Sequence, residues 1–339
     1  MCSTIWLEVT VYAEIIGFVL SVTLNLILLC LIYEMPKETF GNYKYLMFSF
    51  SICGIYYSCC DYWSKPNIHL SEVSFAVFNI RKVTGFNKHL GVTALYLLWL
   101  LWNDARFTHY SFLLPVLISP SSIKAFSIFY EKLSNLGSPC IDHLTYFVNG
   151  SSSIKDEVLI PEFKRDYCMQ PDDFSYVGIQ YFYTDPLTGE TKMHIPSLFS
   201  ITVFTCFMTL SSGSMTYFGV KTYAHLNELT MMTSVDFREL QNQLFRTLVI
   251  QTLIPSVFMY LPVGCTFLFP LFGLTSEAMR NFVPISVALY LCFEPLVAMY
   301  FIKIFRTRII GIQDFFGLEV VTCLKYKKRG QVSSMQTTT

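Results

Sequence analysis

The stretch LFRTLVIQTLIPSVFMYLPVGCTFLFPLFGL, residues 244–274, decides the class of fold. Beyond its third residue it holds no group that is charged at neutral pH, and about 20 apolar residues are enough to cross a bilayer as a helix. Pro255 and Pro262 interrupt it, and each removes a backbone donor. The carbonyls thereby freed belong to Gln251 and Phe258. Lipid offers such carbonyls no partner, so the sequence predicts a kinked helix packed inside a bundle.

The composition is that of a membrane protein. Hydrophobic residues make up 53% of the chain and charged residues 14%, whereas a soluble domain carries about 25% charged residues. The 24 basic and 24 acidic residues cancel, so the electrostatic footprint of a nucleic-acid-binding protein is missing and no nucleic acid is expected as a partner. The 11 cysteines form no CxxC pair and no cluster with histidine, so neither a metal site nor a cofactor is expected.

Hydrophobic runs along the chain predict an all-α membrane protein, a helix bundle over residues 1–309 with a tail over 310–339, in which five spans are clear and the middle of the chain supplies either none or two more. Two of the spans are degraded, because charged residues and prolines such as Asp104, Arg106 and Pro115 interrupt them. The five clear spans cover residues 11–33, 43–62, 195–220, 244–272 and 282–305, and the two weak ones cover 90–104 and 110–130.

A hydrophilic stretch, residues 131–193, is predicted to be an extracellular loop. It contains the only glycosylation triplet of the chain, at Asn149, which is modified only on the exoplasmic side of a membrane. Cys140 and Cys168 could pair in an oxidising compartment, although their spacing does not establish it. Aromatic residues, the turn Asp185-Pro186-Leu187-Thr188-Gly189 and a short return predict a β-hairpin in this loop.

Polar groups inside the predicted spans are the first candidates for function. Asn25 lies near the middle of the first span; a hydrogen bond to a neighbouring helix is the common role of such an amide, and a contact with a ligand is the alternative. Glu294 precedes Pro295 in the last span, and an intramembrane acid is a functional candidate by default. Pro295 joins Pro255 and Pro262 as a predicted hinge.

The distribution of basic residues predicts the orientation. Lys and Arg gather after the last span and are absent from the first ten residues, so the carboxyl end is expected in the cytoplasm and the amino end outside. The inner face would then meet a G protein or the phosphates of membrane lipids. The basic residues expected on that face are Arg238, Arg246, Lys303 and Arg306.

Four segments together resemble one known family. They are GNYKYLMFSFSICGIYYS, SKPNIHL, DDFSYVGIQYFY and QNQLFRTLVIQTLIPSVFMYLPVG, which begin at residues 41, 64, 172 and 241. Outside residues 90–156 the chain is similar to the Str family of nematode seven-transmembrane chemoreceptors. The resemblance implies a receptor that binds a small odorant, couples to a heterotrimeric G protein and resides in the plasma membrane of sensory-neuron cilia.

The chain departs from the family pattern in two places. Glu294-Pro295 replaces an Asp-Pro pair of the last helix, which keeps both charge and kink. The aromatic and basic signature expected at the inner end of the third helix is not recognisable, and the nearest basic group is Arg106. Because that end faces the G protein in this family, a non-signalling or decayed receptor-like protein is the alternative.

The expected mechanism is selection by a ligand between two arrangements of the bundle. The kinked helix is the expected moving part, and the polar side chains expected to contact the ligand are Gln251, Tyr260 and Asn281, with ordinary helix packing as the alternative for each. A transporter would show internal repeats and a channel a selectivity filter, and the sequence shows neither. No catalytic motif is present, so the chain is not expected to be an enzyme.

Overall fold

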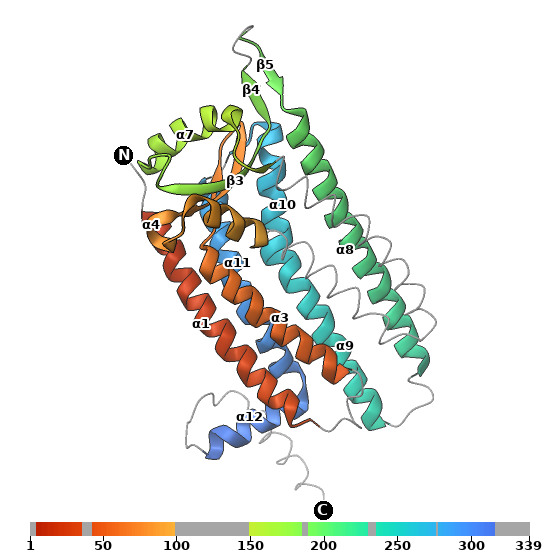
Figure 1. Cartoon of the computed structure of the whole chain (residues 1–339). Coiled ribbons are helices and arrows are strands. Elements are labelled where there is room, and N and C mark those ends of the chain that lie inside the picture. The colour runs from red at the N-terminus through yellow and green to blue at the C-terminus, as the bar shows by residue number, and fades with distance from the viewer. Residues whose placement is uncertain are drawn as a thin grey trace, which may run out of the picture.

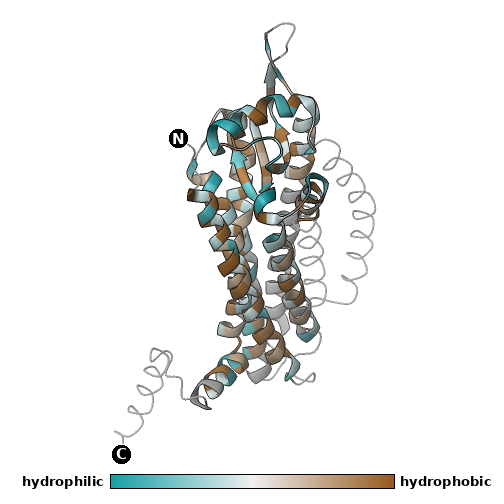
Figure 2. Cartoon of the chain, turned by 60° about the vertical axis from the view of Figure 1, so that its left-hand side comes forward, coloured by the Kyte–Doolittle hydropathy of each residue, from teal (hydrophilic) through white to brown (hydrophobic). Residues whose placement is uncertain are grey.

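The chain forms long helices that lie side by side, closed at one end by a small β-sheet and a short helix (Figure 1). Figure 2 shows hydrophobic residues along the helices and many hydrophilic ones at the closed end. The architecture comes from a computed structural model, which describes residues 5–35, 43–98, 149–184, 189–229, 235–275 and 277–315.

Helices stand in each of the five places where the sequence predicts a clear span, and residues 88–98, at the start of the third span, are also helical. The fourth predicted span, residues 110–130, lies outside the described residues. The helices are α1 (Ile5–Tyr33), α3 (Tyr43–Ser64), α4 (Arg81–Thr84), α7 (Ser153–Tyr167), α8 (Ile195–Leu229), α9 (Val235–Pro255), α10 (Leu261–Leu268), α11 (Glu277–Phe301) and α12 (Lys303–Phe315).

Three helical segments are long and apolar enough to cross a membrane: Ile5–Tyr33, Asn242–Phe272 and Glu277–Phe301. Many of their large apolar side chains are exposed on the outside of the bundle, which suits contact with lipid rather than water. The prediction of an α-helical membrane bundle is thus confirmed. Within the described residues, α1 and α11, the first and last of these segments in the chain, form the most extensive helix–helix contact.

Small residues of α1 allow the close approach of α11. A Cβ atom on Gly17 would lie 2.5 Å from the carbonyl oxygen of Ala288, so no other residue fits there without moving a backbone. One turn further along α1, the Ser21 hydroxyl lies 2.7 Å from the Ser58 hydroxyl of α3. Interfaces between membrane helices favour small and hydroxyl-bearing residues for this reason.

Three antiparallel strands form the sheet in the order β1-β2-β3. They are β1 (Asn67–Leu70), β2 (Ser74–Ile80) and β3 (Phe174–Gln180). The pairing of β2 with β3 runs from Ser74 opposite Gln180 to Ile80 opposite Phe174, and therefore joins segments about a hundred residues apart. We call the sheet together with α7 the cap; it lies at the end of the bundle opposite α12 (Figure 1).

Both faces of the sheet are buried, because side chains alternate between the bundle and α7. Phe75 and Val77 of β2 belong to the apolar core shared with the helices. Ala76 and Phe78 face the other way and pack with Phe163 and other residues of α7. The strand β2 therefore reads as a nearly continuous apolar run, and the sheet connects two separate cores.

The predicted β-hairpin is present as β4 (Phe182–Thr184) and β5 (Thr191–Met193), which pair antiparallel. The cap itself was not predicted. Outside the hairpin, residues 131–193 were predicted to be a loop but contain α7 and β3, and the segment after the second predicted span contains β1 and β2. Their polar residues misled the prediction because His69, Asn79 and Lys155 are buried in the cap together with their apolar neighbours.

We expect Gly17→Val to destabilise the protein, because the added side chain collides with the backbone of α11. Overpacking of this kind costs about 1–3 kcal/mol. The measurement is the thermal unfolding midpoint of the purified protein in detergent. Gly264→Ala is the control, since a Cβ on Gly264 meets no atom within 4 Å. Equal midpoints for the wild type and Gly17→Val would contradict the proposed role of this contact.

Candidate functional site

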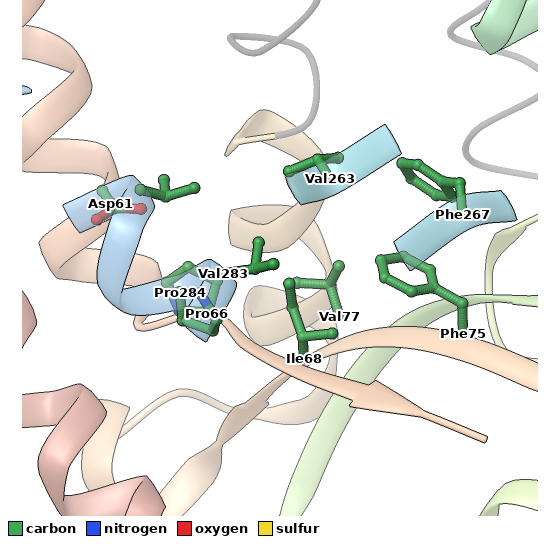
Figure 3. A pocket seen from close by; sticks show the side chains of 10 residues that line it. Asp61, Pro66, Ile68, Phe75, Val77, Val263, Phe267, Val283 and Pro284 are labelled. Atoms are coloured by element: carbon green, nitrogen blue, oxygen red, sulfur yellow. The ribbon is translucent and has the colours of Figure 1, made fainter. Parts of the chain in front are cut away.

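A small pocket lies beneath the sheet, between the ends of α3, α10 and α11 (Figure 3). The cavity among its side chains is only about 20 Å³, room for little more than one water molecule, so a bound ligand must push the lining side chains apart. Nine of the ten lining residues are apolar and the tenth is an acid. The residues that line it are Asp61, Pro66, Ile68, Phe75, Val77, Val263, Phe267, Val283, Pro284 and Val287.

Local backbone geometry brings the end of α3 against the sheet. Lys65 adopts a left-handed conformation, with φ of 43°, directly after α3, and Pro66 cannot continue a helix. The chain therefore turns sharply and enters β1, whose Ile68 lines the pocket. Asp61 lies in the last turn of α3, and its side chain is buried at the same place.

Buried polar contacts hold the cap in place. His69 of β1 places Nε2 3.0 Å from Glu162 Oε2 and Nδ1 3.3 Å from the Tyr167 hydroxyl, both on α7. Burial raises the pKa of Tyr167 to about 12, so its hydroxyl keeps its proton. Arg280, at the start of α11, lies 3.7 Å from Asp166 and stacks over the Tyr167 ring. The sheet, α7 and α11 are thus joined by one set of contacts.

Lys155 of α7 is buried against the sheet. Its Nζ donates hydrogen bonds to the carbonyl oxygens of Gly150, at 3.0 Å, and of Gly178 in β3, at 2.9 Å. Burial lowers the pKa of Lys155 to about 8, and the neighbouring charge of Asp156 acts in the opposite direction. The Asn149 side chain, on which the sequence predicts a glycan, is 1% exposed and donates to the Ser200 hydroxyl of α8. A glycan on Asn149 would have to displace this contact.

Cys168 ends α7 in a left-handed conformation and is disulfide-bonded. The other seven cysteines of the described segments carry free thiols. Cys140, its expected partner, lies outside the described residues, so the pairing remains a prediction.

The helix quoted at the outset is broken where the prolines predict. The α-helical hydrogen-bond pattern of α9 ends at Pro255 and gives way to a π-helical turn, Ser256–Tyr260, before α10 begins. The carbonyl of Phe258, freed by Pro262, accepts a hydrogen bond of 2.8 Å from the Ser286 hydroxyl of α11. A hydroxyl of a neighbouring helix therefore satisfies the broken backbone, as the sequence indicates it must.

The predicted ligand contacts do not line the pocket. Gln251 is buried and its amide donates to the carbonyl oxygen of Glu294 at 3.2 Å, which joins α9 to α11. Tyr260 packs against the core below the cap, and Asn281 is half-buried near the start of α11. Asn25 bonds back to the Ser21 carbonyl of its own helix at 2.9 Å. All four therefore have positions that suit helix packing.

Contacts at the opposite end of the bundle join α9 to α12. The backbone N–H of Lys303, the first residue of α12, donates to Gln243 Oε1 at 3.0 Å, and the Lys303 ammonium lies 3.4 Å from Glu239. Arg246 is exposed and Arg306 is half-buried. The side chain of Arg238 lies outside the described residues.

The sequence did not predict this pocket, because the residues that line it lie far apart in the chain. Asp61 closes a predicted span and resembles an ordinary interfacial acid, and the underside of the sheet arises only through pairing. A usable signal was the run of aromatic and β-branched residues in Ser74–Ile80, which is typical of a strand buried on both faces.

A bundle of apolar helices with a pocket at one end and a broken helix beside it is the architecture of a seven-transmembrane receptor. The family model described as "Serpentine type 7TM GPCR chemoreceptor Str" matches residues 10–310, and the chain belongs to this family. It is therefore an integral membrane protein of a G-protein-coupled chemoreceptor class, and that class is not one of enzymes.

Curated relatives come from nematodes. "Serpentine receptor class r-10" of Caenorhabditis briggsae is 27% identical over 100% of this chain and 97% of its own length. The protein of the same name in Caenorhabditis elegans is 27% identical over 92% of this chain and 93% of its own length. "G-protein coupled receptor str-33" of Caenorhabditis elegans is 22% identical over 88% of each chain.

The lowered pKa of Lys155 predicts a pH dependence of stability. Between pH 8 and the ordinary lysine value of 10.5, the unfolded chain holds a proton that the folded cap has released, so folding becomes more favourable as the pH rises. We expect a gain of about 2 kcal/mol between pH 8 and pH 10, and we expect Lys155→Met to lack it.

The measurement is the difference in unfolding midpoint between wild type and variant as a function of pH. Lys164→Met is the matched control, because Lys164 lies exposed on the same helix. A difference between the wild type and Lys155→Met that does not change with pH would show that Lys155 does not titrate in this window.

Proposed function

We propose that this chain is an odorant-type receptor that binds a small molecule beneath the cap and signals to a heterotrimeric G protein at the opposite end. In this proposal the amino end lies outside and the carboxyl end in the cytoplasm, in the plasma membrane of sensory cilia. Its main support is that a single broken helix, α9 to α10, takes part in the pocket, the hinge and the contacts at the α12 end.

The pocket end of this helix is coupled to the cap. Val263 and Phe267 of α10 line the pocket. The Tyr181 hydroxyl, which is fully buried below the cap, donates a hydrogen bond of 2.9 Å to the carbonyl oxygen of Phe267. A ligand that packs against Val263 and Phe267 therefore acts on the same turn of α10 that the cap holds.

The other end of the helix is held by contacts that a movement would break. If α9 swings about the π-helical turn Ser256–Tyr260, Gln243 must leave the backbone N–H of Lys303, and Glu239 must leave the Lys303 ammonium. A ligand favours this arrangement only if it binds it better than the resting one. Departure of α9 from α12 would open a surface at which a G protein could bind.

The basic residues at this end have a second proposed partner. Arg246 and Arg306 lie where the bundle would meet the inner leaflet, and anionic lipid phosphates attract such residues by about 1 kcal/mol each. Membrane lipids therefore accompany the G protein as partners in this proposal.

The proposal is tested by expressing the full chain in cells with a reporter for G-protein activation and presenting a panel of small volatile molecules. We expect at least one molecule to activate the G protein only in cells that carry the receptor. A ligand-evoked current in reconstituted membranes without any G protein would instead identify a channel.

We expect Pro255→Ala to weaken the response at unchanged surface expression. The new backbone N–H can bond the carbonyl of Gln251 and extend α9, which stiffens the hinge. A shift of the two-state equilibrium by about 1 kcal/mol would lower agonist potency about fivefold. Leu253→Ala, two residues away on the exposed face, is the control. An unaltered dose–response curve for Pro255→Ala would argue against the hinge.

A further inference from the structure

The acid of the pocket is an unusual lining residue. Asp61 is 5% exposed, and its Oδ1 has no hydrogen-bond partner among the described residues. Figure 3 shows its carboxylate at one end of a pocket whose other lining residues are all apolar. A buried carboxylate is costly unless a cation or a donor meets it, so Asp61 is a group in need of a partner.

A second carboxylate lies close by on α1. Glu14 is 3% exposed, and neither of its oxygens has a hydrogen-bond partner within the described part of the chain. The charges of Asp61 and Lys65 both act on it. Lys65 is only partly buried and lies over the Tyr62 ring, 5.4 Å from its centroid. In the described segments no ion pair joins Lys65 to either acid.

The other end of the pocket is aromatic. The rings of Phe75 and Phe267 lie 4.6 Å apart, centroid to centroid, at the end away from Asp61 (Figure 3). Aliphatic side chains, among them Ile68 and Val77, lie between the two ends. The site therefore presents an acceptor at one end and two rings at the other, with apolar side chains between them.

We propose that the pocket takes a small organic amine, with its ammonium group on Asp61 and its hydrocarbon body directed toward Phe75 and Phe267. This inference rests on the proposed function, because it assigns a ligand class to the pocket taken as the odorant site. The ammonium ion supplies both the donor that Asp61 Oδ1 lacks and a positive charge beside the Asp61 carboxylate. An anionic odorant is repelled by that carboxylate, and a neutral one leaves its charge uncompensated.

The test compares amines with alcohols of the same shape. The full-length receptor is purified into nanodiscs without G protein, and binding of 2-phenylethylamine and isoamylamine is measured at pH 7 against 2-phenylethanol and isoamyl alcohol. We expect each amine to bind about tenfold tighter than its alcohol, as a charge-assisted hydrogen bond supplies. Equal binding of amine and alcohol to the wild type overturns the proposal.

Variants assign the preference to Asp61. We expect Asp61→Asn to lose the preference for amines and Asp61→Glu to keep it. The control is Asp172→Asn, the same chemical change at a cap residue whose side chain is 97% exposed, which should leave the preference intact. If Asp61→Asn does not fold, the wild-type ratio together with Asp61→Glu decides the result. A folded Asp61→Asn that keeps the preference refutes the assignment.

The two proposals fail in different ways. Amine binding without G-protein activation would overturn the signalling role and leave the pocket assignment standing. Activation of the G protein by neutral odorants, with no amine binding, would support the signalling role and overturn the assignment of amines to the pocket.

Discussion

The pairing of β2 with β3 is the constraint on which the rest of the architecture depends. It joins Ser74–Ile80 to Phe174–Gln180. The two faces of the resulting sheet are buried in two different apolar cores. One face closes the end of the helix bundle and supplies Phe75 and Val77 to the pocket. The other face receives α7, whose contacts with His69 and Arg280 tie the cap to the start of α11. Without this pairing Asp61 would lie at an open helix end in contact with water.

The helices below the cap differ in their construction: α1 and α11 pack closely, whereas the helix from α9 to α10 is interrupted. Gly17 of α1 admits α11 so closely that the two helices pack backbone against backbone at this point. The helix from α9 to α10 lacks that continuity, because Pro255 and the π-helical turn after it interrupt the hydrogen-bond ladder. Hydrogen bonds from Gln251 and Ser286 join it to α11. A ligand that acts on α10 therefore meets a helix whose backbone hydrogen bonding is interrupted.

The sequence predicted most of the bundle and little of the site. Lipid offers no hydrogen-bond partner to the backbone, so a long apolar run that crosses it must form a helix. The first, sixth and seventh predicted spans therefore follow from hydropathy alone. The freed carbonyl of Phe258 follows from Pro262 by local geometry, and Ser286 satisfies it. The Gln251 amide bonds to a neighbouring helix, and its contact with a ligand stays a prediction, because an amide side chain can fill either role and only its neighbours decide.

By itself the sequence determined that this protein crosses a membrane as a helix bundle, that one helix is broken, and that a hairpin follows the hydrophilic stretch. These properties depend on residues close together in the chain and on the cost of unsatisfied backbone in lipid. The tertiary structure alone decided that two strands separated by about a hundred residues close one end of the bundle, and that Asp61 is buried in an apolar pocket. Strand pairing and burial at such separation depend on the chain's path through space, which no local pattern records.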